Sequence, residues 1–141
     1  MKLHIGVDDS FGLIHSLTTT AANEHDIVVT DRLLHGEEEQ VWSDAGYQGI
    51  EERDEHEDRE MEWNISVRPG KRKQMRPGSP EARLEKTKAQ VRAMVEHPFL
   101  WIKKIFGYCK VRYRGLYKNT NRLYLLSGFS NLIKMKTVLL A

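Results

Sequence analysis

The spacing of the apolar residues changes near residue 68, and this change constrains the fold more than any other feature. Before it, Leu3, Ile5 and Val7 alternate with polar or small residues, which is the period-two pattern of a half-buried strand. A second β-prone run follows a set of turn residues, so residues 2–20 are expected to form a hairpin. Beyond residue 80 the spacing is helical. The sequence therefore predicts strands first and helices last.

The rest of the first half alternates between expected helices and strands. Asn23 is a suitable N-cap for a helix at about 24–35, whose first turn would carry acids that the helix dipole favours. A short strand at 41–42 follows, then a highly acidic helix at about 50–60 and a strand at about 61–67. Strands that alternate with helices are typical of an α/β fold.

The length of the chain fits one domain, and we expect residues 1–141 to form it in three parts. These are a strand-rich part at 2–67, a basic loop at 68–80 and a helical part at 81–141. The loop contains two Pro-Gly pairs and five basic residues, a composition that disfavours regular structure. The helical part is expected to end with a helix at about 116–137.

Charge is distributed unevenly along the chain. Residues 1–60 hold 4 Lys and Arg against 16 Asp and Glu, whereas residues 61–141 hold 18 against 4. This asymmetry fits a protein that holds metal ions on one side and a polyanion on the other, although ordinary solvation explains most of the acids. The basic half is harder to explain in that way, because its net charge of +14 repels itself unless something anionic offsets it.

Composition excludes several classes of protein. A hydrophobic content of 40% and a charged content of 30% fit a globular chain, and no apolar stretch approaches the roughly 20 residues of a membrane helix. The single Cys109 cannot form an internal disulfide, so we expect a cytoplasmic protein without a membrane partner. The histidines show no spacing typical of a zinc site.

Two acids are placed unusually. Asp44 directly follows the apolar run that ends the strand at 41–42, and small residues come after it. Glu96 is the only acid of the last 55 residues and lies in a helix expected at about 81–106. Around a straight helix, Arg92 and Lys103 would lie within about 40° of it. Pro98 should kink or restart this helix, which weakens the argument for Lys103, and an Arg–Glu pair at this spacing is most often an ordinary surface ion pair.

Three stretches carry a resemblance to a known family. "GVDDSFGLIHSLTTTAANEHD", "DAGYQG" and "RAMVEHPFLWIKKIFGYCKVRYRGLYKN" together resemble insertion-sequence transposases of the DDE type, in the group often called IS-five. The resemblance implies an RNase H-like fold in which two aspartates and a glutamate surround two Mg²⁺ or Mn²⁺ ions. It also implies DNA at transposon ends as the substrate, and a full-length transposase as a candidate partner in a homo-oligomer. Carboxylates suit this chemistry because they are the hard oxygen ligands that such ions prefer.

The resemblance assigns roles to individual residues. By motif match, Asp44 is the second catalytic aspartate and Glu96 the catalytic glutamate, and both would be metal ligands. Arg92 and Lys103 complete the family's Arg-x3-Glu-x6-Lys signature and would hold phosphates beside the metals. The tyrosine that begins this signature in related groups is replaced by Ala89. This departure puts a role for that tyrosine in doubt and leaves the acids unaffected.

Basic residues interleaved with tyrosines suit contact with phosphates and stacking on bases. The candidates for DNA contact in the loop and before the last helix are Lys71, Arg72, Lys73, Arg112, Arg114 and Lys118. They leave open a second function, a non-catalytic DNA-binding remnant that interferes with full-length transposase. A third reading, another metal-dependent nuclease on the same fold, fits the Arg-x3-Glu-x6-Lys pattern poorly.

In the family, the first catalytic aspartate lies on a strand that comes before this hairpin in the sequence. Within the family's sheet, that strand lies between the hairpin and the strand that carries Asp44. We therefore expect an N-terminally truncated domain, an incomplete RNase H-like fold lacking its first strand, with a mixed sheet flanked by helices. Asp8 and Asp9 are weak substitutes for the missing acid, because Asp is common in hairpin turns for backbone reasons. Such a chain is expected to be catalytically inactive alone.

Overall fold

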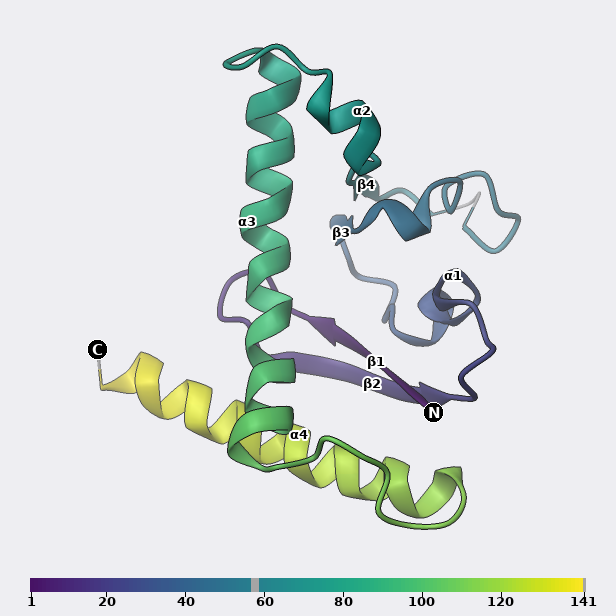
Figure 1. Cartoon of the computed structure of the whole chain (residues 1–141), viewed down its shortest axis with the longest axis vertical. Helices are drawn as coiled ribbons and strands as arrows, with labels where there is room; N and C mark the ends of the chain where they lie inside the picture. The colour runs from purple at the N-terminus through teal and green to yellow at the C-terminus, as the bar shows by residue number, and fades with distance from the viewer. Residues whose placement is uncertain (57–58, 141) are drawn as a thin grey trace. The chain divides into compact units, whose positions relative to one another are not determined.

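The computed structural model describes residues 1–56 and 59–140, and the chain divides into two compact units (Figure 1). The terminal unit combines the two ends of the chain, Met1–Leu33 and Met94–Ala141, and the central unit is Leu34–Ala93. Helix α3 (Pro80–Leu100) contributes residues to both units. The first strands and the last helix therefore share one unit although they lie far apart in the sequence.

The predicted hairpin is confirmed. Strands β1 (Lys2–Val7) and β2 (Ile14–Thr20) pair antiparallel, with Lys2 opposite Thr20 and an irregularity at Gly6–Val7. The carboxylate of Asp8 holds the turn, because it accepts hydrogen bonds from the backbone N–H groups of Ser10, Phe11 and Leu13 at 3.1, 2.6 and 2.6 Å. Asp8 thus has the backbone role that Asp commonly has in turns.

Helix α4 (Leu116–Leu139) confirms the predicted final helix and packs against β2. The amide of Asn131 donates to the carbonyl of Ile14 at 2.8 Å and accepts from its N–H at 2.9 Å. The hydroxyl of Tyr124 donates to the carbonyl of Leu17 at 2.8 Å. The core of the terminal unit consists of Ile14, Leu17, Ile102, Tyr108, Leu123 and Leu126.

The helix predicted at 24–35 is much shorter in the structure. Helix α1 (Asp26–Val29) spans one turn and continues only as a 3-10 turn, η1 (Thr30–Arg32). Its N-cap is His25 rather than Asn23, and no side chain caps it. A run of β-branched residues, Ile27 to Thr30, accounts for the difference because restricted side chains crowd the preceding helical turn.

The central unit contains a parallel pair of strands. Strand β3 (Gln40–Ser43) pairs with β4 (Glu62–Ile65), with Gln40 opposite Glu62, which confirms both predicted strands. The expected mixed sheet is present only as two separate pieces. Among the described residues the strands form two two-stranded sheets, β1–β2 and β3–β4, and the hairpin does not pair with the strand that carries Asp44.

The helix predicted at 50–60 is wrong for the residues that the structure describes there, which form successive turns; Glu57 and Asp58 lie outside the described residues. Backbone hydrogen bonds link Ile50 to Arg53 and Arg53 to His56, three residues apart. Like charges three and four residues apart oppose a regular helix. The segment is held instead by the fully buried Ile50 and by the His56 ring, which makes a T-shaped contact with Trp63 at a centroid distance of 5.1 Å.

Two predictions in the second half need correction. The basic loop at 68–80 contains a short helix, α2 (Pro69–Lys73), which begins at a proline because the first helical position needs no N–H donor. Helix α3 neither ends nor restarts at Pro98 but continues to Leu100 and then becomes a π-helical turn, η3 (Trp101–Ile105). In that turn the N–H of Phe106 donates to the carbonyl of Trp101 at 3.0 Å.

Helices of the length and apolar character needed to span a membrane are absent from the described part of the chain.

Candidate functional site

Asp44 lies at the carboxyl end of β3, in the central unit. It is the N-cap of the 3-10 helix η2 (Ala45–Tyr47), and its Oδ1 accepts a hydrogen bond from the N–H of Gly46 at 2.8 Å. The residue is exposed, and Oδ2 has no hydrogen-bond partner among the described residues. The cap orients the carboxylate by one oxygen and leaves the other accessible.

Gly46 is the residue that permits this orientation. A Cβ at position 46 would lie 2.9 Å from Oδ1 of Asp44, closer than such contacts are normally found. Any side chain there would displace the carboxylate or break the cap. The prediction that small residues after Asp44 clear space around it thus has a direct physical basis at Gly46.

Arg92 is positioned by polar contacts between α3 and the end of β4 within the central unit. The ammonium of Lys88 donates to the carbonyl of Ile65 at 2.8 Å and lies 3.5 Å from the carboxylate of Glu85. One helical turn further along, Nη1 of Arg92 donates to the hydroxyl of the buried Ser66 at 3.4 Å. These contacts fix the half-buried Arg92 against the backbone that follows β4.

Glu96 and Lys103 both belong to the terminal unit and are exposed. Glu96 lies on α3, one turn before its end, and Lys103 lies in the π-helical turn η3. The ammonium of Lys103 lies 5.6 Å from the centroid of the Phe99 ring, a cation–π contact. The angular argument assumed a straight α-helix, whereas the turn that carries Lys103 is π-helical and has more residues per turn.

The donor chemistry of the two acids fits a divalent cation, because both are exposed carboxylates. In neither unit do three described His, Cys, Asp or Glu side chains form a group that could hold a metal ion. Each unit thus offers one of the two predicted ligands, Asp44 in the central unit and Glu96 in the terminal unit.

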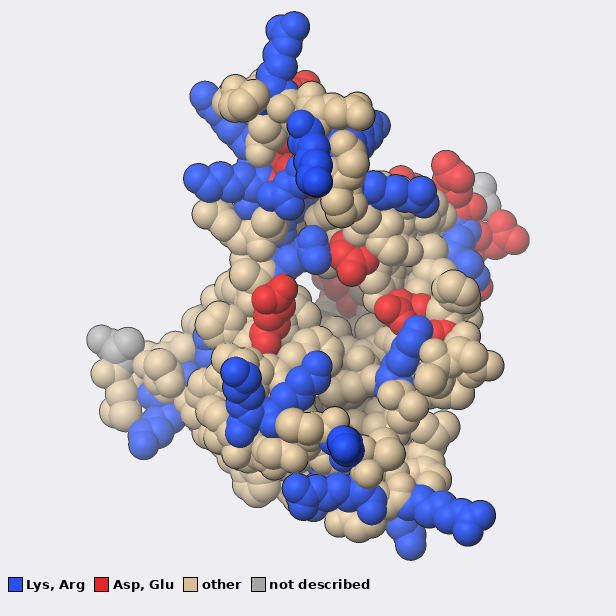
Figure 2. All heavy atoms as spheres, viewed as in Figure 1, with Lys and Arg blue, Asp and Glu red and all other residues tan. Residues whose placement is uncertain are grey.

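All six residues predicted to contact DNA outside the signature are exposed: Lys71, Arg72, Lys73, Arg112, Arg114 and Lys118. The first three form the end of α2 in the central unit. The other three lie in the terminal unit, in the segment before α4 and in its first turn. Figure 2 shows Lys and Arg side chains projecting around α2 and the start of α3, and separately around the start of α4.

The segment before α4 is held by Asn119, which the sequence analysis missed. Asn119 is 2% exposed, and its Oδ1 accepts hydrogen bonds from the Tyr108 hydroxyl and from the backbone N–H groups of Arg112 and Tyr113 at 3.0, 3.1 and 3.2 Å. Its Nδ2 donates to the carbonyls of Tyr113 and Gly115, each at 2.6 Å. An asparagine in the first turn of the predicted last helix was the available signal.

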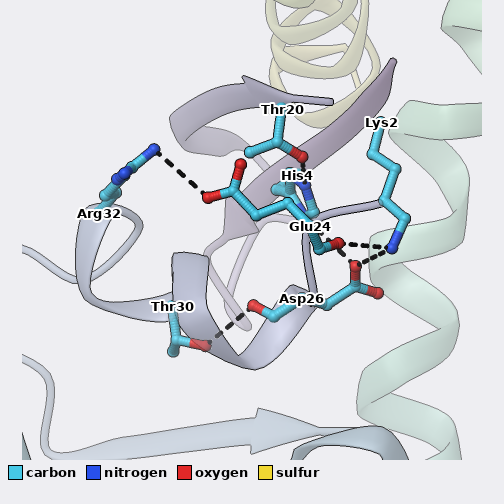
Figure 3. Close-up of polar contacts among 7 residues, drawn as sticks. All are labelled: Lys2, His4, Thr20, Glu24, Asp26, Thr30 and Arg32. Atoms are coloured by element: carbon cyan, nitrogen blue, oxygen red, sulfur yellow. Dashed lines mark hydrogen bonds and ion pairs between the residues drawn. The ribbon is translucent and has the colours of Figure 1, made fainter. Parts of the chain in front are cut away.

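A second buried polar contact joins the hairpin to α1 (Figure 3). The His4 ring is 6% exposed, and its Nε2 lies 2.8 Å from the hydroxyl of Thr20. Its Nδ1 lies 3.9 Å from Oδ1 of Asp26, which also accepts from the ammonium of Lys2 at 3.0 Å. Burial lowers the pKa of His4 below its ordinary value, and the nearby Asp26 carboxylate opposes this shift only in part. His4 is therefore a structural residue in its neutral form.

Comparison with known proteins identifies the family. Residues 1–132 match the family described as Transposase DDE domain. No solved structure matches the chain. The family match covers nearly the whole sequence and includes β3 with Asp44, α3 with Glu96 and most of α4. The chain therefore belongs to the Transposase DDE domain family.

Proposed function

We propose that the chain acts in the transposition of a bacterial insertion sequence of the IS-five-like group, through metal-dependent phosphodiester cleavage and strand transfer. The observation that carries the proposal is the family match over residues 1–132. It is supported by the capped carboxylate of Asp44, which keeps one oxygen accessible at the end of a strand. Transposases of this family generally use divalent metal ions, and their substrate is DNA.

In this proposal Asp44 and Glu96 are metal ligands, and the ions are Mg²⁺ or Mn²⁺, two in the intact site. When bound, such ions supply Lewis-acid activation of the attacking oxygen and stabilisation of the leaving oxygen. Arg92 and Lys103 bind phosphates of the DNA beside the metal site. The hydrogen bond from Arg92 to Ser66 favours this role, because it holds the guanidinium against a buried residue of the central unit.

We further propose that the domain has an RNase H-like fold, that the protein is cytoplasmic and that the chain is catalytically inactive on its own. Inactivity is supported by the donor count within each unit, since neither forms a group of three potential ligands among its described residues. The partner that we propose is a full-length transposase in a homo-oligomer.

Metal binding by Asp44 can be tested without activity. Mn²⁺ broadens the amide resonances of residues close to it, so titration of the ¹⁵N-labelled chain should broaden the amides around Asp44 and Glu96. Asp44→Asn and Gly46→Ala should each reduce the broadening around residue 44, the second because its Cβ would meet Oδ1 at 2.9 Å. Gly70→Ala is the matched control, because a Cβ at Gly70 meets nothing within 4 Å. Unchanged broadening in Asp44→Asn would exclude Asp44 as a ligand.

The inactivity of the chain alone requires a separate assay. Transposon-end DNA incubated with the chain and Mg²⁺ or Mn²⁺ should be cleaved no faster than with Asp44→Asn. Strong cleavage by the wild-type chain that disappears in Asp44→Asn would support the ligand and contradict the inactivity.

The exposed basic residues favour a second candidate function, a non-catalytic DNA-binding remnant that interferes with full-length transposase. In that case affinity for DNA should fall steeply with salt and depend little on sequence. Replacing Arg112, Arg114 and Lys118 by Gln should reduce the slope of log affinity against log salt by roughly three. Binding that is independent of salt would argue against this function.

A further inference from the structure

Helix α4 is apolar on two opposite faces. One face is buried in the terminal unit through Leu123 and Leu126, which are 1% and 6% exposed. The other face carries Leu125, Leu132 and Leu139, which are 59%, 66% and 76% exposed. Exposed aromatic residues flank these leucines, namely Tyr117, Tyr124 and Phe129. Exposed apolar patches of this kind mark interaction sites more often than the rest of a protein surface does.

The three leucines form a regular stripe. They are spaced seven residues apart, and seven residues nearly complete two helical turns, so the side chains lie along one line with a drift of about 20° per repeat. Gly128 and Met135 lie between them, at the spacing of three and four residues that a helix–helix seam uses. A Cβ at Gly128 would meet nothing within 4 Å, so a partner backbone has room to approach there.

The charges on α4 indicate the chemistry of the partner. The 24 residues of the helix contain no Asp or Glu. Arg122 and Lys136 lie along one side of the leucine stripe, as the roughly 100° turn per residue places them, and Lys118 lies on the line of the stripe, seven residues before Leu125. No acid of α4 offsets these charges, whereas an acidic helix would neutralise them.

We propose that the leucine stripe of α4 (Leu125, Leu132 and Leu139) is a docking surface for an acidic amphipathic helix of another protein. That helix would place apolar side chains against the stripe and over Gly128, and Asp or Glu side chains beside the flanking basic residues. This surface is separate from the candidate metal ligands. DNA does not fit it, because duplex DNA presents phosphates and base edges rather than an apolar ridge.

The test uses the full chain and synthetic peptides. The probe is a fluorescent peptide of the same length as α4, with Leu at both seam positions of each heptad and Glu at the flanking positions. One control peptide carries Lys in place of Glu, and another has the acidic composition in scrambled order. At about 0.1 M salt, anisotropy should show the acidic heptad peptide binding at least about tenfold more tightly than either control.

Variants of the chain test the surface itself. Leu132→Glu should weaken binding of the acidic peptide at least about tenfold, because it places an uncompensated charge in the centre of the seam. Leu84→Glu is the matched control, since Leu84 is 49% exposed on a different helix, and it should leave binding unchanged. Both sites are exposed, so circular dichroism should show wild-type helix content in both variants.

Three results would overturn the proposal. The first is equal binding of the acidic peptide to wild type and Leu132→Glu. The second is a concentration-dependent dimer that Leu132→Glu abolishes while the acidic peptide does not bind, which would make a second copy the occupant. The third is binding to phosphatidylcholine–phosphatidylglycerol vesicles that Leu132→Glu abolishes without peptide binding, which would make a lipid surface the occupant.

Discussion

The amide of Asn119 is expected to be the most important single polar group in the terminal unit. It forms five hydrogen bonds, one with the hydroxyl of the buried Tyr108 and four with the backbone of the exposed segment at Arg112, Tyr113 and Gly115. Asn119→Ala removes all of them together. Burial raises the pKa of Tyr108, so its hydroxyl stays protonated near neutral pH and keeps its need for an acceptor.

The expected cost follows from the exposure of each partner. An unpaired buried hydroxyl at Tyr108 costs about 1–3 kcal/mol, whereas each backbone group can bond to water and costs roughly 0.5 kcal/mol. Together these effects should lower the free energy of unfolding by about 3–5 kcal/mol. Free energies of unfolding of chains of this length change by roughly 2 kcal/mol per molar urea, so the unfolding midpoint should fall by about 1.5–2.5 M.

Two controls separate this network from general disruption of α4. Tyr108→Phe removes one hydrogen bond only and should cost about 1 kcal/mol. Asn121→Ala changes an exposed asparagine on the same helix and should change stability by less than about 0.5 kcal/mol. Hydrogen exchange should show lost protection at the amides of Arg112 and Tyr113 in Asn119→Ala. A cost below about 1 kcal/mol, or equal to that of Asn121→Ala, would refute the reasoning.

Two other buried polar groups lead to further predictions. His4 has a pKa below its ordinary value of 6.5 because it is buried, so the unfolded chain binds more protons just below that pH. The contribution of His4 to the free energy of unfolding should therefore be constant above pH 6.5 and fall as the pH drops below that value. Urea titrations at several pH values should show that the free energy of unfolding depends less on pH in His4→Gln than in the wild type. Lys88→Ala leaves the 5%-exposed Glu85 carboxylate without its cation and should destabilise the central unit by about 3 kcal/mol. Lys86→Ala, at an exposed site on the same helix, is the control, and an equal effect of the two would exclude the buried ion pair as the cause.

The candidate site shows both the strength and the limit of reasoning from sequence. The strand before Asp44 and the helix that carries Glu96 were both predicted, because each depends on a short run of residues. The orientation of Asp44 depends on Gly46, which lies two residues further along the chain and was also recognised as part of the motif. The support of Arg92 was not predictable, because Ser66 lies 26 residues away and only packing brings the two together.

Local patterns by themselves determined the hairpin, strands β3 and β4 and helix α4, because each is set by the periodicity of neighbouring residues. The same patterns failed at 24–35 and at 50–56, where β-branched residues and like charges offset weak helical signals. Only the tertiary structure decided which polar residues are buried. Asn119, His4 and the Glu85–Lys88 pair resemble surface residues in sequence, and they are buried because the groups that satisfy their hydrogen bonds are brought to them by folding.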